Sequence, residues 1–412
     1  MAGTPLSLRL SCCKHAVYFA GVDLNDAAVD LAGLDELLNN DERDIQRAVR
    51  TMAQSRIAPY VADWFERATV DDPRGLVKEL GDLGVLGMHL TGYGCAGLGA
   101  TEYGLTCLEL EAVDSGIRSL VSVQGSLAMY ALWRFGSEEI KTRWLPAMAA
   151  GDAVGCFGLT EPDHGSDPSG MTTHARREGS DWVINGGKMW ITNGSIADVA
   201  VIWAQTDEGI RGFAVPTSSP GFSAVEIRHK LSLRASITSE LILDEVRVPG
   251  ECVFPEVRGL GGPLSCLAEA RFGVVWGAMG AARTCLSTAL RYALERSQFG
   301  RPIAGFQLTQ QKLADMELEY VKGMLLALHL ARRKDAGTLR SAQVSLGKLN
   351  NVREALEICR TARTILGANG ISLEYPVIRH MNNLESVLTY EGTVEMHTLV
   401  IGKALTGIDA FR

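Results

Sequence analysis

The chain has 412 residues, more than the roughly 100–200 expected of one domain, so we expect two or three domains. Its apolar share of 46% and charged share of 21% are ordinary for a soluble globular protein, and the net charge of −8 argues against a nucleic-acid partner. No apolar run reaches the roughly 18 residues that would predict a membrane span. The nine scattered cysteines include no CxxC pair, which is typical of reduced thiols in a cytosol-like compartment.

Residues 1–33 are expected to form an N-terminal extension. Between Met1 and Ala20, the apolar patch at 16–20 is too short for the core of a signal peptide. We therefore favour an extension of a cytoplasmic protein. A short organelle-targeting peptide, which would imply the mitochondrial matrix, is the alternative.

Residues 34–155 are expected to form an α-helical domain. The run Asn40 to Arg43 has the composition of a helix start, and apolar residues follow it at near-helical spacing. Gly92–Gly97 matches the GxGxxG dinucleotide pattern, but the segment before it is predicted to be a helix rather than a strand, so no Rossmann site is expected. Further helices are predicted over residues 76–86, 102–113, 120–133 and 138–148.

Residues 156–262 differ in character, because short β-prone runs alternate with Gly, Asn, Asp and Pro. Many short strands with turn signals at this spacing indicate an antiparallel barrel or sandwich. The predicted strands cover residues 182–184, 189–191, 199–202, 213–215, 224–227, 241–243 and 246–248.

Residues 263–412 return to long helices with short connections, which predict a helical bundle. The predicted helices cover residues 270–296, 308–335, 339–366 and 375–388. The expected fold is therefore multidomain, with an α-helical N-terminal domain, a β-barrel-like middle domain and a C-terminal four-helix bundle. No HExxH, CxxC or spaced acidic cluster indicates a metal, and no GxSxG elbow indicates a hydrolase.

Glu391 lies between Tyr390 and Gly392, just after a predicted helix. Glycine allows another molecule to approach the backbone closely, and an apolar, aromatic neighbourhood raises the pKa of a carboxyl until it can act as a base near neutral pH. The alternative is a solvated glutamate in a surface turn, and the short motif alone does not decide between them.

Two segments of the middle region suggest half of a cofactor pocket. Phe157–Asp167 is rich in Gly, Thr, Ser and Pro, so its backbone N–H groups can point outward towards a flat ligand with carbonyl acceptors. In Met189–Asn193, the indole of Trp190 could cover a ring and the hydroxyl of Thr192 could bond its edge. The alternative is a domain linker with a core tryptophan.

Arg118 stands near the hydroxyls of Ser119 and Ser122, and such a group can hold a carboxylate bidentately. From the spacing alone, a structural pair with Asp114 at i, i+4 is favoured, worth a few tenths of a kcal/mol. Glu111 is a second candidate partner for the guanidinium.

Taken together, these segments resemble the acyl-CoA dehydrogenase family over nearly the whole chain, from about Leu34 to Phe411. Lys230–Ser236 and Arg296–Gly300 also match family motifs, in family order. Within the family, the chain resembles the branch that acts on glutaryl-CoA, through the motifs Glu111–Ser119, Ile365–Ile371 and Tyr390–Gly407. The resemblance implies an FAD cofactor between the middle domain and the bundle, an acyl-CoA substrate, a homotetramer, and an electron-transfer flavoprotein as electron acceptor.

The resemblance also implies roles for individual residues. Glu391 would be the catalytic base. The residues implied at the substrate are Arg118, Ser119, Ser122, Glu111, Ser166, Arg271 and Gly392. The residues implied at FAD are Phe157, Leu159, Thr160, Gly165, Ser166, Trp190, Ile191, Thr192, Thr393 and Glu395. Those implied at the FAD of a neighbouring subunit are Arg296, Phe299, Gln307, Gly367 and Ala368.

The implied reaction is the oxidative decarboxylation of glutaryl-CoA to crotonyl-CoA, as in amino-acid degradation. Glu391 would take the α-proton while the β-hydride passes to the flavin, and Arg118 would hold the distal carboxylate. Because a buried guanidinium without an anion is costly, we expect that carboxylate to be its partner. The alternatives are a short- or branched-chain acyl-CoA dehydrogenase that does not decarboxylate, and a non-catalytic protein that binds flavin or acyl-CoA.

Overall fold

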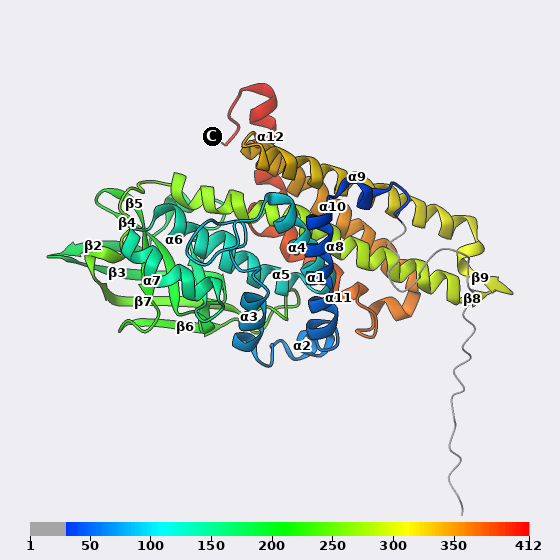
Figure 1. The fold of residues 1–412 in the computed structure, drawn as a ribbon, viewed down its shortest axis with the longest axis horizontal. Helices are drawn as coiled ribbons and strands as arrows, with labels where there is room; N and C mark the ends of the chain where they lie inside the picture. The colour runs from blue at the N-terminus through cyan, green and yellow to red at the C-terminus, as the bar shows by residue number, and fades with distance from the viewer. Residues whose placement is uncertain (1–29, 412) are drawn as a thin grey trace, which may run out of the picture.

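The structure is a computed structural model that describes residues 30–411, so the predictions for Met1–Ala20 lie outside the described residues. The chain runs from a helical part through a β-sheet to a second helical part whose long helices extend away from the sheet (Figure 1). The expected three-part fold is confirmed. None of the helices within 30–411 combines the length and the hydropathy needed to cross a membrane.

The first helical part begins with a capping box at α1, in which Asn39 and Glu42 each accept a hydrogen bond from the other's backbone N–H, both at 2.9 Å. Gly92–Gly97 lies in the loop between α3 and α4, after a helix, as its context predicted. The elements are η1 (Leu34–Leu37), α1 (Asn40–Met52), η2 (Ala53–Ile57), α2 (Val61–Arg67), α3 (Pro73–Asp82), α4 (Ala100–Val113), α5 (Ser115–Ser122), η3 (Val123–Met129), α6 (Tyr130–Phe135) and α7 (Glu138–Ala149).

The middle part is a curled seven-stranded sheet in the order β1-β4-β2-β3-β7-β6, with β5 paired to β4. Its elements are β1 (Gly155–Gly158), η4 (Pro168–Gly170), β2 (His174–Glu178), β3 (Asp181–Thr192), η5 (Gly194–Ile196), β4 (Val199–Thr206), β5 (Gly209–Pro216), β6 (Phe222–Glu226), β7 (Thr238–Val248) and η6 (Gly250–Cys252). The expectation of an antiparallel sheet is wrong at β4. Both β1 and β2 pair parallel to β4, β2 through the pair His174 and Gln205, because neither strand is joined to β4 by a hairpin.

Two predicted turns are irregularities inside longer strands. The runs 182–184 and 189–191 both belong to β3, and the runs 241–243 and 246–248 both belong to β7. The pairing of β3 with β7 shifts register between Ile184 and Gly186, where Gly186 has a φ of 144°. The glycine pair after Asn185 therefore forms a β-bulge rather than a turn between two strands.

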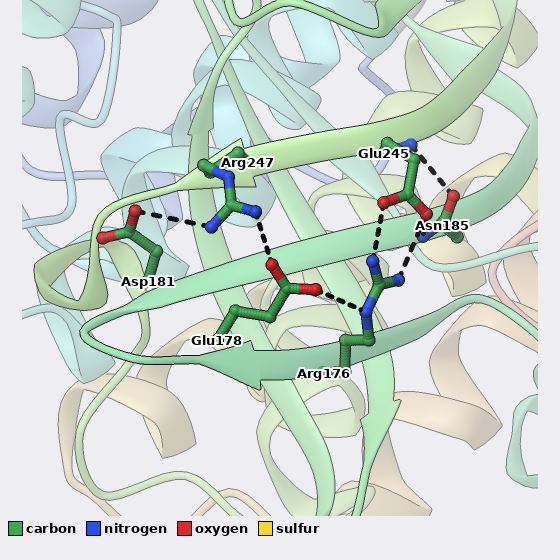
Figure 2. Close-up of polar contacts among 6 residues, drawn as sticks. All are labelled: Arg176, Glu178, Asp181, Asn185, Glu245 and Arg247. Atoms are coloured by element: carbon green, nitrogen blue, oxygen red, sulfur yellow. Dashed lines mark hydrogen bonds and ion pairs between the residues drawn. The ribbon is translucent and has the colours of Figure 1, made fainter.

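Charged side chains on the exposed side of the sheet connect β2, β3 and β7 at this bulge (Figure 2). Glu245, with a φ of 51°, accepts hydrogen bonds from Arg176 at 2.6 and 3.1 Å and from the Asn185 amide at 2.8 Å. Glu178 accepts from both Arg176 and Arg247. The network holds the bulged strands together side by side, and it lies in solvent.

The C-terminal part contains the four expected long helices and one more, α12, that the sequence did not predict. Of the residues in α12, only His397 is buried, so the helix packs little of its surface against the rest of the described chain. The elements are α8 (Gly261–Glu295), β8 (Ser297–Gln298), β9 (Arg301–Pro302), η7 (Ile303–Gly305), α9 (Gln307–Asp335), α10 (Ser341–Leu366), η8 (Gly367–Ile371), α11 (Val377–Thr389) and α12 (Val394–Thr406).

Glycines allow α4 and α8 to pack closely. A Cβ on Gly104 of α4 would lie 2.4 Å from the Trp276 ring, and a Cβ on Gly280 of α8 would lie 2.0 Å from the Leu108 carbonyl oxygen. Neither position accepts a side chain without displacing backbone or a large ring. This close approach sets the spacing of the two helices that carry Glu111 and Arg271.

Candidate active site

Glu391 lies in the short turn between α11 and α12. Its φ is 53° and that of Gly392 is 101°, so two successive residues adopt left-handed backbone conformations. Such a φ is uncommon for a residue with a side chain. A Cβ on Gly392 would approach His397 Nε2 to 2.8 Å, so glycine is required there.

One carboxylate oxygen of Glu391, Oε2, is buried and has no hydrogen-bond partner within residues 30–411. Burial raises the pKa of this carboxyl above its ordinary value. Three nearby cations, Arg118, Lys348 and Arg271, offset only part of that shift. The alternative of a solvated surface glutamate is wrong, and the carboxyl has the environment of a general base.

Arg118 is fully buried on α5 and reaches the same turn. Its Nε donates to Glu111 Oε2 at 2.6 Å, and its Nη2 donates to the Tyr390 hydroxyl. Asp114 instead accepts from Arg379 at 2.7 Å and from Asn383 at 2.9 Å. The Asp114–Arg118 pair favoured by spacing is therefore wrong, because the kink between α4 and α5 aims Asp114 at α11.

The pairing with Glu111 also corrects one argument for a substrate carboxylate. Arg118 already has an anionic partner, so its burial alone does not demand another. The open groups around it are more informative. Arg118 Nη1, Glu111 Oε1, Ser115 Oγ and Ser122 Oγ are all buried without a hydrogen-bond partner in the described chain. Because buried polar atoms are nearly always paired, this cluster indicates room for a polar group of a ligand.

Two further cations support the turn of Glu391. Arg271 of α8 donates from Nε to the Glu391 carbonyl oxygen at 2.6 Å. Lys348 of α10 donates to the carbonyl oxygens of Tyr390 and Gly392, the latter at 2.6 Å. Sequence reasoning gave Arg271 a place at the substrate and missed Lys348. The available signal was a lysine in helical register with Val344 and Val352, on the buried face of α10.

The two predicted halves of the cofactor pocket do lie side by side. The Met189 N–H donates to the Thr160 carbonyl at 2.9 Å. The buried Lys188 donates to Glu161 at 2.8 Å and to the Leu159 carbonyl at 3.2 Å, which fixes the loop against β3. Trp190, with a φ of 63°, is 58% exposed, so the alternative of a core tryptophan is wrong.

The other residues of this half divide by depth. Phe157, Leu159 and Ile191 are buried, Thr160 and Thr192 are half-buried, and Gly165 and Ser166 are exposed. A mostly exposed indole beside an exposed glycine-rich loop fits the ring of a flavin. The indole would cover one face of the ring, and polar groups beside it would bond the edge of the ring. The residues present here therefore suit FAD.

The structure does not bring the second set of predicted FAD residues to this loop. Arg296 and Phe299 lie at the β8–β9 hairpin, at the opposite end of the molecule from the sheet (Figure 1). Gln307 begins α9, and Gly367 and Ala368 begin η8. All five of these residues are exposed. Thr393, by contrast, caps α12 two residues after Glu391, and Glu395 is exposed in the first turn of that helix.

A cavity of about 580 Å³ lies elsewhere, between α1, α4, α8 and α9. None of the predicted site residues lines it. The candidate site is therefore marked by the convergence of Glu391, Arg118, Arg271 and Lys348 rather than by the volume of a cavity.

Three family models match the chain. They describe the acyl-CoA dehydrogenase N-terminal domain (residues 39–152), middle domain (156–246) and C-terminal domain (258–406). The chain belongs to the acyl-CoA dehydrogenase family. The expectations of an oxidoreductase and of an FAD cofactor are confirmed at the level of that family.

Individual relatives refine this assignment. The chain is similar to a crystal structure of glutaryl-CoA dehydrogenase from Mycobacterium smegmatis, with 68% identity, a TM-score of 0.92, and 93% of this chain and 99% of that chain covered. A second glutaryl-CoA dehydrogenase structure from that organism, in complex with FADH2, is 64% identical with a TM-score of 0.90, covering 92% and 97%. The human mitochondrial short-chain specific acyl-CoA dehydrogenase is 36% identical, covering 80% of this chain and 82% of its own length.

Proposed function

We propose that the protein oxidises and decarboxylates glutaryl-CoA to crotonyl-CoA and CO2. One observation carries this proposal. The buried Arg118 has no hydrogen-bond partner at Nη1 among the described residues, and its Nη2 donates to Tyr390, the neighbour of Glu391. A thioester whose α-carbon is at Glu391 could therefore place a distal carboxylate at the guanidinium.

The charges of the site support an anionic rather than a neutral acyl group. Arg118, Arg271 and the ammonium form of Lys348 face only two carboxylates, Glu111 and Glu391. One positive charge is left over for a substrate carboxylate, which would make a charge-assisted hydrogen bond to the buried Arg118. An anion bound here would also favour the ammonium form of Lys348.

The chain's own residues supply the acid–base steps. Glu391 takes the α-proton of the thioester through its unpaired Oε2, and its raised pKa suits that transfer near neutral pH. FAD, when bound, supplies the acceptor for the β-hydride. The unsaturated acyl group then loses its distal carboxylate as CO2, and the γ-carbon takes up a proton. Arg118 holds that carboxylate until the C–C bond breaks.

We infer that FAD lies against the loop Phe157–Ser166 and Trp190, and that residues of the β8–β9 hairpin, Gln307, Gly367 and Ala368 contact the FAD of a neighbouring copy in a homotetramer. Electrons would pass on to an electron-transfer flavoprotein. Ser119, Ser166, Arg271 and Gly392 are proposed to lie at the substrate, and Thr393 and Glu395 near the cofactor.

A second candidate is a short-chain acyl-CoA dehydrogenase that does not decarboxylate. The Glu111–Arg118 pair favours it, because this pair satisfies the guanidinium charge without any substrate carboxylate. The 36% identity to the human short-chain enzyme is consistent with that reading.

Substitution of Arg118 distinguishes the two. In the FAD-loaded enzyme, Arg118→Gln should lower kcat/KM for glutaryl-CoA roughly 10- to 100-fold, the worth of a hydrogen bond to a charged group, and should affect butyryl-CoA far less. The wild type should release CO2 from glutaryl-CoA. Glu391→Gln serves as a control that should bind FAD but not bleach it with either thioester. Equal losses for both substrates, or no CO2, would exclude the glutaryl-CoA proposal.

A further inference from the structure

Three consecutive backbone carbonyls at the catalytic turn accept hydrogen bonds from two cations, the buried Lys348 and the half-buried Arg271. Lys348 Nζ donates to the oxygens of Tyr390 and Gly392, and Arg271 Nε donates to the oxygen between them, that of Glu391. Both donors come from long helices, α10 and α8, which pack against each other. The turn is therefore held from two rigid elements of the bundle rather than by its own backbone.

The turn needs such support because of its conformation. Glu391 and Gly392 are both left-handed, with φ of 53° and 101°, directly after α11 ends. Residues with side chains leave this region when the surroundings allow it. Relaxation of the backbone would swing the Glu391 side chain, since no group in residues 30–411 holds its Oε2 by a hydrogen bond.

A lysine at position 348 carries an energetic cost, because its amino group is buried away from water. It is 1% exposed and lies in register with apolar residues of α10, where a methionine would pack without a charge. Burial lowers the pKa of Lys348 to about 7, because the site solvates an ammonium group less well than water does. No carboxylate makes a direct ion pair with it among the described residues. The hydrogen bonds to the carbonyl oxygens of the turn are the interactions that compensate Lys348 for its burial.

We propose that Lys348 is a positioning residue for the reaction, which together with Arg271 clamps residues 390–392 and so aims the Glu391 carboxylate at the substrate. This inference rests on the proposed function, because it assumes that Glu391 is the base. Lys348 acts through the backbone and touches neither substrate nor cofactor.

The clamp also has an electrostatic side. The charged groups that face Glu391 are Arg118 from α5, Arg271 from α8, Lys348 from α10 and Glu111 from α4, together with the phenol of Tyr390. His397 of α12 faces the same turn, and burial lowers its pKa to about 3, so its ring is neutral. Loss of the Lys348 charge removes one of three cations that hold the pKa of Glu391 down.

The experiment compares Lys348→Met, which removes both charge and donors, with Lys348→Gln, which keeps an N–H donor without the charge. Asn351→Leu is the matched control. Asn351 lies one turn further along α10, is equally buried, and also donates to two backbone carbonyls, those of Val275 and Gly323, at 2.9 and 3.0 Å. It does not contact the catalytic turn.

In the FAD-loaded protein, Lys348→Met should lower kcat by roughly 100-fold, as expected for a base displaced by about 1 Å, with little change in KM. The loss should be the same for glutaryl-CoA and butyryl-CoA, unlike the selective loss from Arg118→Gln. The acidic limb of the kcat profile should move to higher pH. Amide hydrogen exchange in the peptide spanning 385–396 should become faster, and Lys348→Gln should recover part of the rate.

Asn351→Leu should lower the Tm while keeping kcat per folded enzyme within about twofold of the wild type and leaving exchange at 385–396 unchanged. If Lys348→Met behaves in this way, the positioning role is overturned although the proposed function stands. If Lys348→Met does not fold, the decision passes to Lys348→Gln, for which a wild-type kcat and pH profile overturn the inference. A wild-type protein whose flavin neither thioester reduces overturns the proposed function, and the inference with it.

Discussion

Gly277 illustrates how the site depends on the smallest residue in its wall. It lies on α8 opposite the ion pair of Arg118 with Glu111. A Cβ at this position would come within 2.1 Å of Glu111 Oε2 and 3.1 Å of Arg118 Nε. The carboxylate that orients the guanidinium thus occupies the space that an alanine side chain would take.

We therefore expect Gly277→Ala to push Glu111 away from Arg118 and to destabilise the protein by about 1–3 kcal/mol, as overpacking does. Turnover of glutaryl-CoA should fall more than that of butyryl-CoA, because the carboxylate anchor is disturbed. Urea unfolding and steady-state assays measure the two effects. Gly402→Ala is the control, since this glycine of α12 has open space around it and should gain roughly 0.5–1 kcal/mol. A Gly277→Ala enzyme with unchanged stability would contradict the crowding.

At the level of residues, the sequence indicated candidates where a role depends on neighbours in the chain and was insufficient where it depends on distant segments. Glu391 and Trp190 could be proposed from their local motifs, with a surface glutamate and a core tryptophan left open as alternatives. The choice of Glu111 over Asp114 as the partner of Arg118 could not, because it follows from the angle between α4 and α5. Lys348 meets its carbonyls only after α10 and α11 pack, so its helical register indicated burial but not a partner in the turn.

At the level of elements, Glu109 joins three helices through one carboxylate. This residue of α4 is 1% exposed and accepts hydrogen bonds from Gln46 and Arg50 of α1 and from Arg283 of α8. Burial alone would raise the pKa of Glu109, but Arg283 and Arg50 outweigh it and lower the pKa to about 2. The first helix of the fold is thereby tied to the C-terminal bundle.

The lowered pKa of Glu109 predicts the direction in which stability changes with pH, and acid unfolding can test that direction. The carboxylate contributes stability above its unfolded pKa of about 4.5, and the contribution is lost as the pH falls towards 2. We expect Glu109→Gln to cost roughly 2–4 kcal/mol at neutral pH, because two arginines lose their anion, and to flatten the stability profile between pH 5 and 2. Unfolding by urea at several pH values measures this. Glu79→Gln, which breaks an exposed pair with Arg56, should change little, and an equal effect would refute the argument.

Elements could be predicted where periodicity was unbroken. The long helices α8 to α11 follow their apolar spacing and were found. The strands β3 and β7 were each divided in two, because the bulge at Gly186 and the left-handed Glu245 resemble turn signals in one dimension. Only pairing with the neighbouring strand distinguishes a bulge from a turn.

At the level of the whole molecule, the proposed cofactor residues lie at two ends that one chain cannot bring together (Figure 1). Phe299 at the tip of the β8–β9 hairpin is 94% exposed, and Leu308 nearby is 75% exposed. Large apolar side chains this exposed indicate a contact surface. The arrangement supports the proposal that a second copy completes each FAD site.

We expect Phe299→Ser to weaken that contact, with a lower molar mass in light scattering and less FAD retained after gel filtration. The fold of the chain itself should be unaffected, since the Phe299 side chain is mainly exposed to solvent. Leu405→Ser, at another exposed apolar residue in α12, is the control and should retain its FAD. Full FAD content in an intact assembly of the Phe299 variant would argue against a shared site.

The length of α8 has a consequence for how such chains can diverge. This single helix carries Arg271 beneath the catalytic turn, Gly277 against the ion pair, and ends at the hairpin. Inserting or deleting one residue within it would rotate everything beyond by about 100° and shift it by about 1.5 Å. The number of residues between Arg271 and Arg296 therefore fixes the distance and the rotation between the catalytic turn and the hairpin. Alignments of working relatives should show substitutions along this helix but no gaps.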